Sequence, residues 1–159
     1  MALVWNPVDL SSLGDEVLRE VGMIDEGHRF TSDIQPSVVV MGDDGMLKQL
    51  MRILMDNSIK YTPAGGEISL RVGIKGAQAT VVVQDEGVGI PETAISSIFD
   101  RFYRADESRT RGTGGTGLGL SIAKWIAQRH NGAIEVVSRE QIGTRMTVLL
   151  PVAEEFTIQ

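Results

Sequence analysis

Residues 111–121 read RGTGGTGLGLS, and the context of these glycines decides between two classes of fold. Gly112, Gly114 and Gly117 match G-x-G-x-x-G, the fingerprint of dinucleotide-binding Rossmann proteins. That fingerprint needs a strand that runs directly into the first glycine. The preceding residues, DRFYRADESRTR, are charged and do not alternate, so the Rossmann interpretation fails. A Walker-type phosphate loop fails as well, because no Lys-Ser or Lys-Thr follows the glycines.

The same stretch still fits a glycine loop that leads into the first turn of a helix, expected at residues 117–130. The first backbone N–H groups of a helix are unpaired, and its dipole is positive at that end, so the position suits a phosphate. A plain loop before an ordinary helix explains the glycines equally well. This stretch alone leaves both interpretations open.

The composition indicates one soluble domain. The chain has 159 residues, 42% of them hydrophobic, which is enough for one ordinary core. Its net charge of −6 opposes binding to nucleic acid or an anionic membrane, and the lack of cysteine excludes disulfides, zinc–thiolate sites and thiol nucleophiles. No apolar run approaches the roughly 18 residues that cross a bilayer. The first ten residues, MALVWNPVDL, do not resemble a signal peptide.

Hydrophobic periodicity predicts an alternation of short strands and longer helices. In EISLRVGI, for example, every second residue is apolar, as in a half-buried strand. The expected strands are 28–34, 36–42, 67–74, 79–85, 133–138 and 144–150. The expected helices are 11–23, one that is capped by Asp43 or Asp44 and runs to about Tyr61, a short one near 92–102, and one from 117 to about 130, with a polar stretch at 103–116. This order predicts an α+β fold, a two-layer sandwich with a mixed sheet and helices on one face.

One polar face lies on the helix expected to end near Tyr61, before Pro63. Within LMRILMDNSIKYTP (50–63), Asn57, Lys60 and Tyr61 are three and four residues apart and therefore neighbours. An amide oxygen can complete the coordination of a phosphate-bound Mg²⁺, a lysine adds positive charge, and a tyrosine offers an aromatic edge. An asparagine bonded to a neighbouring loop and a tyrosine in the core are the simpler alternatives.

Two further stretches contain candidate ligand-binding residues. In QDEGVGIPE (84–92), Asp85 ends a strand, and its carboxylate could accept a hydrogen bond from an amino group such as that of adenine. Gly87 and Gly89 would let the backbone turn beside a ligand, although such a run is often only a turn. IFDRFYRADESRTR (98–111) offers several arginines that could meet a γ-phosphate, or could form a solvated loop.

The ordered set NSIKY, DEGVGI, IFDRFYR and GGTGLGL resembles the N, G1, F and G2 boxes of the ATP-binding catalytic domain of sensor histidine kinases. These belong to the GHKL superfamily, whose fold is the Bergerat fold with a mobile ATP lid. The resemblance runs from about residue 9 to 151, and includes GDDGMLKQL before the N box and a final GTRMTVLLP. It implies binding of ATP or ADP with Mg²⁺.

The resemblance also implies roles for residues that contact the nucleoside. Asp85 would accept the adenine amino group, supported by Gly87 and Gly89, with Ile90 against the base. Tyr61 would border the nucleoside. Thr144 would reach the contact between Asp85 and adenine through water.

A second set would hold the triphosphate. Asn57 would bind Mg²⁺, with Lys60 near the phosphates, and Arg104, together with Arg101, would contact the γ-phosphate. The glycine-rich loop would cradle phosphates at a helix start through Gly115, Gly117, Leu118 and Gly119. The lid would lie within residues 91–116. Asn57, Lys60 and Arg104 would thus carry the phosphoryl transfer.

Ile53 departs from the family pattern. Many members have a second asparagine four residues before the one that matches Asn57, so metal binding would depend on Asn57, water and phosphates. The hydrolytic relatives, which are chaperone, mismatch-repair and topoisomerase ATPases, carry at that position a glutamate that activates water. Isoleucine cannot remove a proton, which favours a kinase over an ATPase.

The phosphoacceptor is the second departure. The family's acceptor histidine lies in a helical hairpin with a sequence like H-E-x-R-x-P, and neither His28 nor His130 matches it. We therefore expect the catalytic fragment of a longer, cytoplasmic kinase region, monomeric alone. Its partners would be its own dimerisation and phosphoacceptor domain and a downstream response regulator. An anti-sigma-type serine kinase, a GHKL ATPase and a degenerate regulatory module of the same fold remain alternatives.

Overall fold

The computed structural model describes residues 4–100 and 119–153. Its main sheet has five strands in the order β2-β4-β5-β7-β6, in which β2 and β4 are parallel and the other pairs antiparallel. These strands are β2 (Arg29–Ile34), β4 (Glu67–Lys75), β5 (Gln78–Asp85), β6 (Ala133–Arg139) and β7 (Gly143–Pro151). A separate antiparallel pair joins β1 (Asn6–Asp9) to β3 (Val39–Gly42).

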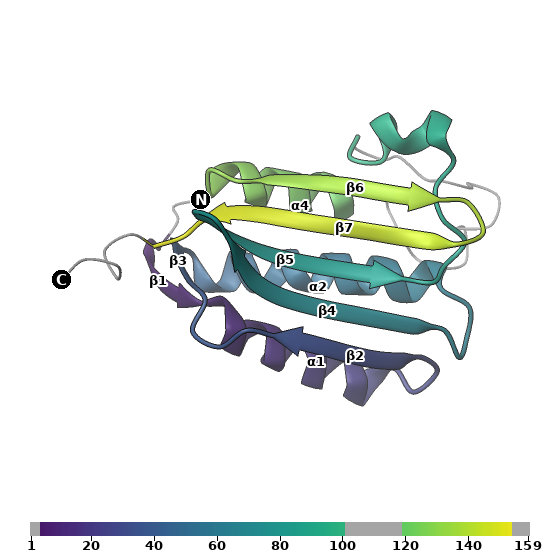
Figure 1. Ribbon diagram of the computed structural model, residues 1–159, viewed down its shortest axis with the longest axis horizontal. Coiled ribbons are helices and arrows are strands. Elements are labelled where there is room, and N and C mark those ends of the chain that lie inside the picture. Colours follow the sequence, from purple (N-terminus) through teal and green to yellow (C-terminus); the bar gives the residue numbers. More distant parts are fainter. Residues whose placement is uncertain (1–3, 101–118, 154–159) are drawn as a thin grey trace.

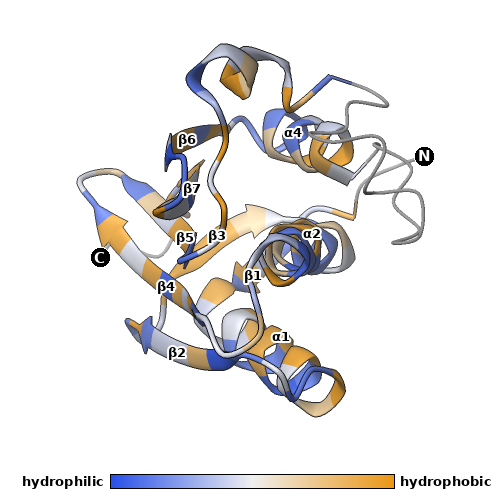
Figure 2. Ribbon diagram, turned by 90° about the vertical axis from the view of Figure 1, so that its right-hand side faces the viewer, coloured by the Kyte–Doolittle hydropathy of each residue, from blue (hydrophilic) through white to orange (hydrophobic). Residues whose placement is uncertain are grey.

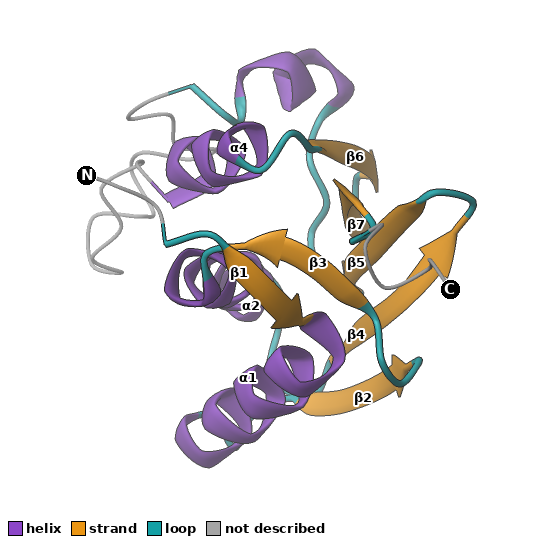
Figure 3. Cartoon of the chain, turned by 90° about the vertical axis from the view of Figure 1, so that its left-hand side faces the viewer, coloured by secondary structure: helices purple, strands orange, loops and turns teal. Residues whose placement is uncertain are grey.

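Three helices cover one face of the main sheet: α1 (Leu10–Ile24), α2 (Asp44–Tyr61) and α4 (Gly119–Arg129). Figure 1 shows them behind the five strands, and Figure 2, seen from one end, shows the two layers side by side. The short β1–β3 pair lies at the other end, next to the helices (Figure 3). The expected α+β two-layer sandwich with a mixed sheet is confirmed.

The core forms because strands and helices each present an apolar face to the space between the layers. In β4, Ile68, Leu70 and Val72 are buried and alternate with more exposed residues, as the period of two predicts. Helix α2 supplies a fully buried stripe at helical spacing, which comprises Leu47, Leu50, Met51, Leu54 and Met55. Asp43 caps this helix by accepting a hydrogen bond from the backbone N–H of Met46 at 3.0 Å.

Three local differences from the sequence expectations have physical causes. Strand β3 begins only at Val39, because Pro36 is followed by Ser37 in a left-handed conformation with φ of 62°. The short helix expected near 92–102 is a 3-10 helix, η1 (Glu92–Ser97). Strand β1 was not expected, since NPVD shows no alternation and forms only by pairing with β3. In the described ranges, no helix combines the length and apolarity needed to cross a membrane.

Candidate functional site

Of the residues singled out in the sequence, those that the structure describes meet at one end of the sheet. Helix α2 ends there, β5 ends there at Asp85, and β7 begins beside it, because the register places Asp85 opposite Thr144. The first residue of α4, Gly119, lies at the same end, which is on the right in Figure 1 and faces the viewer in Figure 2. Segments more than 80 residues apart in sequence therefore surround one region.

The carboxylate of Asp85 is buried and fixed in orientation. The residue is 8% exposed, and its Oδ1 accepts hydrogen bonds from the backbone N–H of Gly87 at 2.8 Å and of Thr144 at 3.2 Å. No described residue donates a hydrogen bond to its Oδ2. One oxygen is thus held by the protein, while the other keeps its capacity to accept from a ligand.

The glycines after Asp85 are required by close packing. A Cβ on Gly87 would lie 2.5 Å from the carbonyl oxygen of Tyr61 and 2.9 Å from Oδ1 of Asp85. Gly89 has a φ of 75°, and a Cβ there would collide with the backbone of Arg139. The backbone N–H of Val88 donates to the carbonyl of Tyr61 at 3.1 Å. The loop is therefore tied both to the end of α2 and to the turn that follows β6.

The three polar residues at the end of α2 share a face, as their spacing predicted. Asn57 and Tyr61 are partly buried, and Lys60 is exposed with its Nζ 5.4 Å from the centre of the Tyr61 ring. Ile53 lies one turn earlier, and its Cγ2 is 3.6 Å from where a Cβ of Gly119 would stand. The start of α4 thus lies directly beside the N-box face of α2.

A metal ion at this end would have few protein ligands. Within residues 4–100 and 119–153, no group of three or more His, Asp or Glu side chains is placed to hold a metal. Asp56, adjacent to Asn57 in sequence, is paired with Arg52 at 3.8 Å on the side of α2 that faces α1. Burial raises the pKa of Asp56 above its ordinary value, and the nearby charge of Arg52 opposes that shift only in part. An amide oxygen such as that of Asn57 can complete the coordination of a phosphate-bound Mg²⁺.

Two hydroxyl residues of this site were missed in the sequence. Ser138, on β6, accepts a hydrogen bond from the backbone N–H of Ile90 at 2.8 Å and lies 2.8 Å from Oγ1 of Thr144. Thr62, directly after α2, has a buried hydroxyl about 3 Å from the Cβ position of Gly87. Strand alternation places Ser138 on the inward face of β6, and this is the signal that could have identified it.

Not every expected site residue can be placed. Asn57, Lys60, Tyr61, Asp85, Gly87, Gly89, Ile90, Gly119 and Thr144 lie at this end of the sheet. Arg101, Arg104, Gly115, Gly117 and Leu118 lie outside the described residues. The same holds for most of the expected lid.

Comparisons with known proteins agree with this architecture. The family model of histidine kinase-, DNA gyrase B- and HSP90-like ATPases matches residues 42–154. The chain is 41% identical over 141 residues to the sensor histidine kinase YkoH of Bacillus subtilis, a match that covers 89% of this chain and 31% of that protein. The chain thus spans less than two fifths of the length of such curated relatives.

Two solved structures share the fold closely. The mycobacterial sensor histidine kinase MprB superposes with a TM-score of 0.82 at 30% identity, covering 94% of this chain and 99% of that one. Full-length ShkA in complex with AMPPNP superposes with a TM-score of 0.80 at 26% identity, covering 96% of this chain and 32% of that one.

Proposed function

The chain belongs to the family of histidine kinase-, DNA gyrase B- and HSP90-like ATPases, as a catalytic ATP-binding domain of the sensor histidine kinase type, and from this we propose how it uses ATP. It binds Mg-ATP at the end of the sheet where α2, β5, β7 and α4 meet. It then donates the γ-phosphoryl group to a histidine on a separate dimerisation and phosphoacceptor domain. A response regulator would receive the phosphoryl group from that histidine.

The buried carboxylate of Asp85 is the observation that carries this proposal. A carboxylate offers only acceptors, and its Oδ2 is left for a ligand that brings a donor, such as the exocyclic amino group of adenine. Gly87 and Gly89 allow the loop after Asp85 to pack closely against the backbone of Tyr61 and Arg139. Ile90, which packs against the core, would contact the base, and Tyr61 would border the nucleoside. ShkA, of the same fold, was solved with the ATP analogue AMPPNP.

The phosphates would lie between the end of α2 and the start of α4. Gly119 begins α4, and the unpaired N–H groups of a helix start favour a negatively charged group. Asn57 would hold Mg²⁺ and Lys60 would face the phosphates. Mg²⁺, when bound, would neutralise charge on the phosphates during transfer. Arg104 and Arg101, with Gly115, Gly117 and Leu118, complete the proposed phosphate site.

Ile53 favours phosphoryl transfer to a protein over hydrolysis. Its side chain lies beside the start of α4, one turn before Asn57, and it has no group that could remove a proton from water. Transfer of a phosphoryl group depends mainly on alignment and charge compensation. A site that positions ATP without activating water would therefore wait for the acceptor imidazole. This favours the kinase over the ATPases of the same fold, while the stretch IFDRFYR favours a histidine kinase over the anti-sigma-type serine kinases.

Calorimetric titration with ADP and ATP, with and without Mg²⁺, tests the proposal on the wild type and on Asp85→Asn. We expect saturable binding by the wild type and a loss of at least about tenfold in affinity for the variant, because an essential acceptor is replaced. The exposed Asp33→Asn change on β2 is the matched control and should bind as the wild type does. Equal affinity of Asp85→Asn and wild type, with both folded, would remove Asp85 from the site.

A further inference from the structure

Ser138 sits at the centre of a small hydrogen-bond network beside the proposed base site. Its Oγ is 2.8 Å from the backbone nitrogen of Ile90, 3.1 Å from the carbonyl oxygen of Gly143 and 2.8 Å from Oγ1 of Thr144. The sheet register places Ser138 directly opposite Thr144, and Thr144 opposite Asp85. One strand, β7, therefore lies between Ser138 on β6 and Asp85 on β5.

The direction of each hydrogen bond follows from the number of protons available. A serine hydroxyl has one proton and two lone pairs. The carbonyl of Gly143 can only accept, so it takes the proton of Ser138. The N–H of Ile90 can only donate, so it takes one lone pair of Ser138. The remaining contact is satisfied only if the hydroxyl of Thr144 donates its own proton to the second lone pair of Ser138.

We propose that Ser138 is a positioning residue for base recognition, which fixes the hydroxyl of Thr144 as an acceptor toward the nucleotide. This inference rests on the proposed reading of adenine by Asp85. The hydroxyl of Thr144 donates its proton in a hydrogen bond to Oγ of Ser138, so Thr144 presents only oxygen lone pairs to the site. Its backbone N–H is also committed, to Oδ1 of Asp85 at 3.2 Å. The backbone is therefore fixed, and only the hydroxyl could rotate.

This arrangement favours a ligand that brings hydrogen-bond donors to the site. Asp85 and Thr144 both offer acceptors, which suit a 6-amino purine either directly or through one bridging water. Hypoxanthine and guanine carry a carbonyl oxygen at position 6, which would face these lone pairs without a proton between them. Leaving buried polar groups unpaired is costly, so the 6-oxo bases are rejected. Ser138 contributes to this rejection without touching the base.

Ser138→Ala tests the inference through the ratio of dissociation constants for ADP and IDP, measured by calorimetry. The base of IDP differs from that of ADP by a carbonyl oxygen in place of the 6-amino group and by a proton on N1. Without Ser138, the hydroxyl of Thr144 can rotate and donate to that oxygen. We expect the preference for ADP to fall by about tenfold, mainly through tighter relative binding of IDP. Ser138→Thr keeps the hydroxyl and should keep the preference.

A double-mutant cycle separates this role from a structural one. Thr144→Val removes the hydroxyl on which Ser138 acts, so adding Ser138→Ala to it should leave the ADP to IDP ratio unchanged. The matched control is Ser32→Ala on the exposed face of the edge strand β2. If Ser138→Ala weakened the binding of ADP and IDP equally, the inference would be overturned, because Ser138 would then only hold the backbone of Ile90 in place. An equal shift of the ratio in both backgrounds would do the same.

Asp85→Asn distinguishes this result from a failure of the proposed function. If Asp85→Asn binds ADP as the wild type does, the base site itself is misassigned. If Asp85→Asn loses ADP while Ser138→Ala leaves the ADP to IDP ratio unchanged, only the role of Ser138 is wrong. Thermal melting of each variant shows whether a loss of affinity reflects a loss of fold.

Discussion

At the scale of single residues, Thr62 holds a buried hydroxyl that forms no hydrogen bond within the described structure. The residue is 5% exposed. Replacing such a hydroxyl by a methyl group of the same shape removes no bond and relieves the cost of burying an unpaired polar group. We therefore expect Thr62→Val to leave the free energy of unfolding unchanged or to raise it by up to about 1 kcal/mol.

Urea denaturation of Thr62→Val and Thr62→Ser measures this effect. Thr62→Ser keeps the hydroxyl and loses the buried methyl group, so it should be less stable than the wild type by about 1 kcal/mol. A clear loss of stability in Thr62→Val would mean that the hydroxyl has a partner in solution, such as a bound water.

Gly87 allows a second prediction at the same scale. A Cβ there would lie 2.5 Å from the carbonyl of Tyr61 and 2.9 Å from Oδ1 of Asp85, so the loop must shift away from the end of α2. We expect Gly87→Ala to lower the free energy of unfolding by about 1–3 kcal/mol and to weaken ADP binding, because Asp85 moves as well.

Gly22 provides the matched control for that substitution. It lies in α1, and a Cβ there would have no atom within 4 Å. Gly22→Ala should raise the free energy of unfolding by about 0.5–1 kcal/mol through helix propensity and leave ADP binding unchanged. Thermal melting and calorimetry report the two quantities. If both alanine variants behaved alike, the close approach at Gly87 would not hold in solution.

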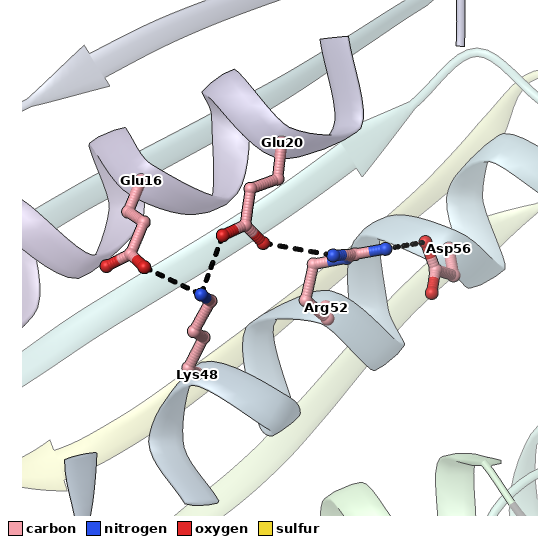
Figure 4. Close-up of polar contacts among 5 residues, drawn as sticks. All are labelled: Glu16, Glu20, Lys48, Arg52 and Asp56. Atoms are coloured by element: carbon pink, nitrogen blue, oxygen red, sulfur yellow. Dashed lines mark hydrogen bonds and ion pairs between the residues drawn. The ribbon is translucent and has the colours of Figure 1, made fainter. Parts of the chain in front are cut away.

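At the scale of elements, charged side chains join α1 to α2 at their outer surface (Figure 4). Nζ of Lys48 on α2 bonds to Glu16 at 2.6 Å and to Glu20 at 2.7 Å, both on α1. Arg52 bonds to Glu20 as well, at 3.1 Å. The hydrogen bond from Lys48 lowers the pKa of Glu20, and the hydrogen bonds to Glu16 and Glu20 raise the pKa of Lys48.

These shifts give the pH dependence of the contact between the two helices. Glu20 has a lowered pKa, so its contribution is present above its ordinary value of 4.5 and is lost as the pH falls through the folded value. Lys48 has a raised pKa, so its contribution is present below 10.5 and is lost as the pH rises through the folded value. We expect Lys48→Met to be less stable than the wild type at neutral pH, with a difference that shrinks below pH 4.5.

Urea midpoints of wild type and Lys48→Met between pH 3 and 9 check this expectation. The difference should also shrink at high salt, because the pairs are partly exposed and screened. Lys75→Met is the control, since Lys75 lies exposed at the end of β4. A difference that stayed constant across the pH range would assign the loss to packing of the lysine stem instead.

Elements differ in how far their own sequence specifies them. Helix α2 was predicted within one residue, because Asp43, the apolar stripe and Pro63 all act locally. Strand β1 was not, since NPVD becomes a strand only through its partner β3. The parallel pairing of β2 with β4 likewise depends on how α2 returns the chain. Local signals specify elements, while pairing depends on the packing of the whole sheet.

The candidate site also combines residues specified by a local stretch of sequence with residues brought in by sheet pairing. Asp85 and its glycines could be predicted from one short stretch, because a single turn brings them together. Ser138 could not be assigned a role, because its contacts with Ile90 and Thr144 join three segments that meet only in the folded sheet. The sequence therefore predicts groups within one motif well, and predicts poorly the residues that orient them from a neighbouring strand.

At the scale of the whole molecule, both histidines of the chain are committed to structural contacts. In His28, Nδ1 lies 2.8 Å from Oδ2 of Asp25, and Nε2 lies 2.7 Å from the carbonyl oxygen of Thr62. His130 is 3% exposed, with Nδ1 at 2.8 Å from the carbonyl of Ile126 and Nε2 accepting from the backbone of Asp43 at 3.1 Å. Neither imidazole offers a free nitrogen to the γ-phosphorus of ATP.

We therefore expect the chain to bind ATP without phosphorylating itself, and to need an acceptor from another domain. Incubation with Mg-ATP labelled at the γ-phosphate should leave the chain unlabelled. Addition of a helical hairpin that carries an exposed acceptor histidine should give a label on the hairpin that is lost in acid and kept in alkali. The hairpin with that histidine replaced by glutamine should stay unlabelled. Label on His28 or His130 would show that these contacts open in solution, and that the catalytic site can reach its own chain.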